Sequence, residues 1–97
     1  MIVYVSIGNS DDKLTQRHWH DFHEDVRCEL IGAGADFHGQ WSSPSTDVWQ
    51  NACWCVEVVE GVVAELKRNL AEIATRYGQD SIAWAEAPTT EFLAASP

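Results

Sequence analysis

Three closely spaced histidines are the first side chains in this sequence whose types and spacing could do chemistry. His18, His20 and His23 stand beside Glu24. On a helix, His20 would lie next to both His23 and Glu24, because residues three and four positions apart share one face. Two imidazoles and a carboxylate are zinc ligands, but HDFHE matches neither HExxH nor its inverted form HxxEH. The pattern therefore favours an exposed polar helix face, and we predict no bound metal or cofactor.

A second set of reactive side chains lies on segments with strand character. If Val3 and Val5 point toward the core, strand alternation places Tyr4 on the opposite face. The same alternation sends Cys53, Cys55 and Glu57 to that face from a later segment, together with Asp36, His38 and Gln40 from another. One sheet face would then collect thiols, an imidazole, a phenol and an amide. The predicted ligand-binding residues on this face and its rim are Tyr4, His38, Gln40, Trp41, Cys53 and Cys55.

Two interpretations of this face remain open. A cysteine beside a histidine is the pairing of a nucleophile and its base, or half of a metal site. No third residue that would orient such a pair can be assigned from the sequence, so no catalytic residue is predicted. Small cysteines also behave as ordinary hydrophobic residues. The favoured interpretation is therefore a semi-polar face that pairs with a second copy or is partly covered by the C-terminal tail.

Strands and helices that would position these residues follow from periodicity. β-Branched and alternating apolar residues predict strands over residues 2–7, 36–41, 52–59 and 81–86. Apolar stripes at spacings of three and four predict two helices. The first has Thr15 as N-cap, Leu14 and Trp19 as a hydrophobic staple, and an end near Gly32. The second is opened by Gly61, and Gly78 is the C′ residue just beyond its end.

This element order is that of a split βαβ unit. It predicts an α+β, ferredoxin-like βαββαβ sandwich, with a four-stranded antiparallel sheet in the order 4-1-3-2 and two helices on one face. Residues 1–88 would form this single domain and residues 89–97 a C-terminal tail. Loop 8–13 (GNSDDK) is a weak candidate for ion binding before a helix, and Trp41 and Trp49 bracket the loop over 42–50.

Composition excludes several classes of protein. The chain has 97 residues, of which 45% are hydrophobic, and its six basic and fifteen acidic residues give a net charge of −9. That charge disfavours nucleic-acid binding and favours a basic protein partner. The proposed partner-binding ridge on the first helix consists of Asp21, Glu24, Asp25 and Glu29. No apolar run reaches the roughly 18 residues of a membrane span, and segment 1–7 lacks signal-peptide character, so we expect a cytoplasmic protein.

The cysteines are expected to be free thiols. There are three, Cys28, Cys53 and Cys55, and an odd number in a reducing compartment argues against a disulfide framework. Two strand residues separated by one position have Cα atoms roughly 6.5–7 Å apart, at the limit for a disulfide.

Three longer segments, MIVYVSIGNSDDKLTQRHWHDF, WQNACWCVEV and RYGQDSIAWAEAPTTEFL, resemble small uncharacterised proteins of actinobacterial phages. The resemblance covers most of the chain and brings no catalytic motif. It implies an accessory product made in the host cytoplasm that binds, blocks or sequesters a host component.

The sequence is therefore compatible with three functions. The leading one is a non-enzymatic, homodimeric binding protein that acts on a host cytoplasmic component, such as an acidic inhibitor of a defence protein. The alternative is a sponge for a small nucleotide-like signal. The second alternative is a small Cys/His hydrolase or metal-binding protein.

Overall fold

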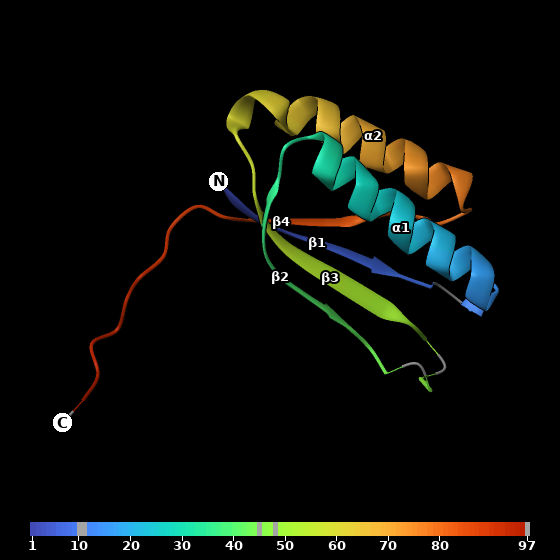
Figure 1. Ribbon diagram of the computed structural model, residues 1–97, viewed down its shortest axis with the longest axis horizontal. Helices are drawn as coiled ribbons and strands as arrows, with labels where there is room; N and C mark the ends of the chain where they lie inside the picture. Colours follow the sequence, from blue (N-terminus) through green and yellow to red (C-terminus); the bar gives the residue numbers. More distant parts are fainter. Residues whose placement is uncertain (10–11, 45, 48, 97) are drawn as a thin grey trace.

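The computed structural model describes residues 1–9, 12–44, 46–47 and 49–96. Its elements are β1 (Ile2–Gly8), α1 (Gln16–Gly32), β2 (Asp36–Ser42), β3 (Asn51–Glu57), a 3-10 turn η2 (Glu60–Val62), α2 (Val63–Arg76) and β4 (Ala83–Ala87). The strands form one antiparallel sheet in the order β2-β3-β1-β4. Both helices lie on the same side of this sheet (Figure 1). The predicted ferredoxin-like sandwich and its strand order are confirmed.

The first helix begins and ends where its sequence predicts. The Thr15 hydroxyl accepts a hydrogen bond from the His18 amide at 3.2 Å, which satisfies one of the free donors of the first turn. The helix ends at Gly32, and Gly34 follows in the left-handed region with a φ of 77°. Leu14 and Trp19 both join the hydrophobic core. These contacts set the position of the histidine group relative to the sheet.

The core lies between the two helices and the sheet. Val3, Val5 and Trp54 are completely buried, as the strand alternation predicts. The helical stripes that cover them contribute Trp19, Phe22, Val26 and Leu30 from α1, and Leu66, Leu70 and Ile73 from α2. Burial of this one-sided stripe on each helix accounts for the position of both helices on the same sheet face.

Strand boundaries differ slightly from those predicted. The strand predicted over 52–59 covers Asn51–Glu57, and Val59 is 69% exposed. The strand predicted over 81–86 begins later, at Ala83. Val58 stays buried beyond the end of β3, and its amide donates to the Met1 carbonyl at 3.0 Å. The apolar run therefore extends past the ladder because the chain is still packed against the core.

Beyond β4, residues 88–96 form neither helix nor strand. This tail leaves the body of the domain near the N-terminus (Figure 1). Phe92 and Leu93 are 91% and 83% exposed. The tail therefore does not cover the sheet face that lacks helices. Ser10 and Asp11 of the predicted ion-binding loop, and Ser45 and Val48 of loop 42–50, lie outside the described residues.

Candidate functional site

The face of the sheet opposite the helices, the open face, is an ordered array of side chains. The strand register places residues from β4, β1, β3 and β2 side by side in rows. The first row is Ala83, Ser6, Cys53 and Trp41, the second is Ala85, Tyr4, Cys55 and Gly39, and the third is Ala87, Ile2, Glu57 and Asp36. The first two rows carry no charged residue, and the carboxylates gather in the third.

Each thiol on this face is paired with a hydroxyl. Ser6 Oγ donates a hydrogen bond to Cys53 Sγ at 3.1 Å. The Tyr4 hydroxyl bonds to the Cys55 thiol, and this hydrogen bond, with the electrostatic effect of Cys55, raises the pKa of Tyr4. The phenol therefore stays neutral at physiological pH. A neutral Ser or Tyr hydroxyl can orient the thiol beside it, but it does not remove the thiol proton as a base would.

The imidazole predicted to join these thiols has a different partner. His38 Nε2 lies 3.1 Å from Glu57 Oε1, and both side chains are about half exposed. The two residues sit at the charged end of the open face, in and beside the third row. The described contacts therefore form a His–Glu pair and two hydroxyl–thiol pairs, and they do not assemble the Cys–His pair that a nucleophilic mechanism requires.

Aromatic side chains are the most exposed apolar feature of the open face. The rings of Tyr4 and Trp41 lie 6.2 Å apart in a tilted contact. Trp41 is 53% exposed and Tyr4 is 39% exposed. Trp49, in the loop, is 61% exposed, whereas Trp54 fills the core. A pair of rings fixed against each other on a strand surface offers a large contact area at little cost in side-chain entropy.

A shallow cavity adjoins this aromatic pair at the rim of the open face, where β2 and β3 meet their connecting loop. Its volume is about 400 Å³. It is lined by Ser6, Ile7, Trp41, Ser42, Ser43, Asn51, Ala52 and Cys53. An indole, three hydroxyls, an amide and a thiol make a surface that can both stack on and hydrogen-bond to a small ligand. Of the predicted ligand-binding residues, Trp41 and Cys53 line this cavity, and Gln40 does not.

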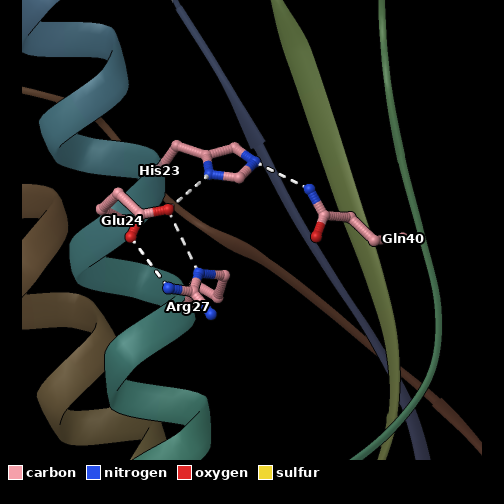
Figure 2. Close-up of polar contacts among 4 residues, drawn as sticks. All are labelled: His23, Glu24, Arg27 and Gln40. Atoms are coloured by element: carbon pink, nitrogen blue, oxygen red, sulfur yellow. Dashed lines mark hydrogen bonds and ion pairs between the residues drawn. The ribbon is translucent and has the colours of Figure 1, made fainter.

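Gln40 does not belong to the open face, so its predicted orientation is wrong. An irregularity between Phe37 and Gly39 shifts the register of β2 against β3, and Gln40 pairs with the buried Trp54. Because side chains alternate along a strand, a shift of one residue sends Gln40 to the helix side. There its amide Nε2 lies 3.0 Å from His23 Nε2 (Figure 2). The sequence pattern carries no signal for this bulge apart from Gly39.

His23, which Gln40 reaches, is packed above the core. Its ring centre lies 4.7 Å from that of Trp54. Burial lowers the pKa of His23, an effect that the neighbouring Glu24 partly offsets. The neutral imidazole can then accept a hydrogen bond from the Gln40 amide. This contact joins α1 to the edge strand β2.

The acidic residues predicted to form a partner-binding ridge are largely engaged within the domain. Glu24 accepts two hydrogen bonds from Arg27, at 3.0 and 3.1 Å (Figure 2). Across the helix pair, Asp25 accepts from the Tyr77 hydroxyl and Glu29 accepts from Asn69. These contacts make part of the ridge a seam between α1 and α2. Asp21 lies on the same side, where its charge helps to raise the pKa of Tyr77.

The three histidines of α1 have different surroundings. Within residues 1–9, 12–44, 46–47 and 49–96, no three side chains of His, Cys, Asp or Glu are arranged to hold a metal ion. His18 and His20 are exposed on α1, whereas His23 is held by Gln40. The three cysteines are free, with Cys28 exposed and Cys53 buried. None of the helices that the structure describes is both long and apolar enough to cross a membrane.

Comparison with known proteins gives a structural likeness. No family model and no curated protein matches the sequence. The solution structure of the C-terminal domain of the MgtC protein from Mycobacterium tuberculosis is similar, with a TM-score of 0.64 and 14% sequence identity, and the match covers 87% of this chain and 84% of that domain. The crystal structure of an unknown protein from Galdieria sulphuraria matches with a TM-score of 0.53 and 15% identity, over 87% of this chain and 45% of that one. At such identities the likeness shows the ferredoxin-like fold.

Proposed function

We propose that this protein is a non-enzymatic binding protein that works as a homodimer, joined through the open face. The observation that carries the proposal is the exposed Tyr4–Trp41 pair, set in two rows of small, uncharged residues. Such a surface is flat and apolar at its centre. Its residues have no helix above them in the monomer.

Charge favours a second copy as the occupant. Two copies of a chain with a net charge of −9 repel each other wherever their acidic surfaces meet. The first two rows of the open face lack charged side chains, so pairing there brings no like charges into direct opposition. A two-fold axis also lets one patch serve both subunits, because the same residues face each other. Glu57 and Asp36, in the third row, would then lie toward the edge of the interface.

Oligomeric state tests this proposal directly. Size-exclusion chromatography with light scattering should give a dimer for the wild type, and Tyr4→Lys should give a monomer because it buries a charge at the centre of the interface. Ala85→Glu, on the neighbouring strand, supplies a second variant should Tyr4→Lys fail to fold. A wild-type monomer at high protein concentration would overturn the dimer.

A matched control separates the interface from a general effect of charge. Ile31 is 51% exposed on α1, away from the open face. Ile31→Lys changes the net charge as Tyr4→Lys does, and it should leave the dimer intact. Dissociation by both variants would show that the open face has no special role.

The rim cavity supports a second candidate function, the capture of a small planar ligand. Trp41 offers a stacking surface, and the hydroxyls of Ser42 and Ser43 lie beside it. Because the net charge disfavours anions, an uncharged heteroaromatic ligand suits the cavity better than a nucleotide.

We expect adenosine to bind more tightly than AMP in isothermal titration calorimetry. Trp41→Ala should abolish binding and Trp49→Ala, which alters an exposed indole outside the cavity, should not. Equal losses in the two variants, or no binding of either probe, would contradict ligand capture.

The role in a phage-infected host stays a prediction. A host protein is the occupant that we expect at the open face should the wild type prove monomeric. The contacts of Glu24, Asp25 and Glu29 within the domain favour the open face over the acidic ridge as the surface for such a partner.

A further inference from the structure

A second cavity lies on the other side of the β2–β3 end, between this end of the sheet and the N-terminal half of α1. Its volume is about 330 Å³. It is lined by Gln16, Trp19, His20, His23, Ser42, Ser43, Gln50 and Asn51. It shares Ser42, Ser43 and Asn51 with the rim cavity but opens on the helix side. Imidazoles and polar neutral groups therefore dominate its lining.

The charges of α1 are separated around this cavity. Asp25 and Glu29 lie on the edge of α1 that faces α2. There Asp25 bonds to Tyr77, the C-cap residue of α2, and Glu29 bonds to Asn69 of α2. Glu24 forms an ion pair with Arg27 through two hydrogen bonds, and its charge also acts on His20 and His23. No carboxylate lines the cavity, and its ionisable lining groups are His20 and His23. On a strongly acidic molecule, this concave surface becomes positive when its imidazoles are protonated.

Hydrogen bonds already made in the lining leave several donors available. Gln16 Oε1 accepts from Gln50 Nε2 at 3.0 Å, so the Gln16 amide NH₂ is left over. Ser43 Oγ accepts from the Asn51 amide at 2.9 Å, and its own hydrogen remains. His20 is exposed and makes no hydrogen bond with a described residue, but it interacts electrostatically with Glu24 and His23. Together with the Ser42 hydroxyl, these groups are donors that can reach a ligand, and the side-chain oxygens of Gln50 and Asn51 are acceptors in the same lining.

We propose that this cavity binds a small oxyanion, such as a carboxylate, sulfate or phosphate group, and that it does so more tightly as the pH falls. Donor groups around a concave site, with imidazoles that gain charge, are the arrangement that an oxyanion needs. His20 and the Gln16 amide are its first ligands, and Ser42 and Ser43 complete the site from β2 and the loop. The site does not include Tyr4 or Trp41 of the open face, although it shares Ser42 and Ser43 with the rim cavity.

Protonation of His23 would strengthen the site. The groups that face His23 are Glu24, Arg27 and His20 on its own helix, the uncharged Gln40 on β2 and the uncharged Trp54 on β3 (Figure 2). The Gln40 amide can turn its oxygen toward a protonated ring, so the contact survives in either state.

Titration of the full chain with sodium sulfate, followed by NMR, tests the proposal. Sulfate keeps its charge across the pH range used, and a parallel titration with sodium chloride at equal ionic strength measures the effect of general screening. We expect saturable shifts of the Gln16, His20 and Gln50 signals, with a Kd at least about tenfold lower at pH about 5.5 than at pH about 8. His20→Gln should weaken binding by at least about fivefold, because it removes a charged donor.

His18→Gln is the matched control, because His18 lies on the same helix but does not line the cavity. It should leave the sulfate Kd and its pH dependence unchanged. Shifts that do not saturate, that chloride reproduces, or that persist unchanged in His20→Gln would overturn the proposal. Gln16, His20 and Gln50 line this cavity and not the rim cavity, so their signals report on it separately from Tyr4 and Trp41.

Discussion

The two faces of the sheet differ in what holds their residues in place. On the helix face, Trp54, Val3 and Val5 are fully buried beneath two amphipathic helices. On the open face, Tyr4 and Trp41 remain exposed, although Tyr4 lies on β1 between Val3 and Val5, and Trp41 lies on β2 beside β3. Burial stabilises the first set, whereas the second set contributes little to the fold of the monomer. The exposed Tyr4–Trp41 pair, which folding of the monomer does not require, is the surface on which the proposed dimer rests.

The sharpest test of this difference compares one tryptophan from each face. Trp54→Ala should lower the free energy of unfolding by about 3–5 kcal/mol, because it leaves a large cavity in the core. Trp41→Ala should change it by less than about 1 kcal/mol, because the indole is already hydrated. Urea denaturation followed by circular dichroism measures both, in the Tyr4→Lys background so that dimer dissociation does not contribute. Similar losses in the two variants would show that the open face is part of the core.

A smaller effect is expected in the reactivity of the thiols. Titration of the unreduced protein in denaturant should count three free groups, and a count of one would reveal a disulfide. In the native protein, Cys28 should react fastest because it is exposed, and Cys53 slowest because it is 7% exposed and covered by its neighbours. Single Cys→Ser variants assign the phases. A Cys53 that reacts as fast as Cys28 would mean that the open face is looser than its strand register indicates.

The smallest expected effect is the change in stability with pH that His23 produces at the edge of the covered face. Burial lowers the pKa of His23, so the unfolded chain binds a proton there more readily than the folded one. The associated stability is fully present above the ordinary imidazole pKa of about 6.5, and it is lost as the pH falls through the lowered value. Thermal unfolding in chloride buffer should show a larger fall in Tm on acidification for the wild type than for His23→Gln. His18→Gln should behave as the wild type, and an equal fall in all three proteins would contradict the burial of His23.

The structure also shows on which strands the alternation of the sequence predicts side-chain direction correctly. It holds along β1 and β3, where regular apolar residues pair with the core, and it places Tyr4, Cys53 and Cys55 on the open face as predicted. It fails along β2, an edge strand whose side chains are mostly exposed. With no buried residues to set the register, a bulge near Gly39 costs little, and Gln40 reverses its direction.

The sequence by itself determined the element order, the caps of α1 and the buried stripe of each helix, because these depend on neighbours a few residues apart. Hydrophobic periodicity predicted the strands and helices, and their order with the right-handed crossover rule predicted the ferredoxin-like fold with both helices on one face. Tertiary structure decided the partners of the polar groups: His38 with Glu57, Tyr4 with Cys55, and Glu29 with Asn69. It also created both cavities at the β2–β3 end. Contacts between residues distant in the chain depend on register, bulges and helix packing, which local periodicity does not encode.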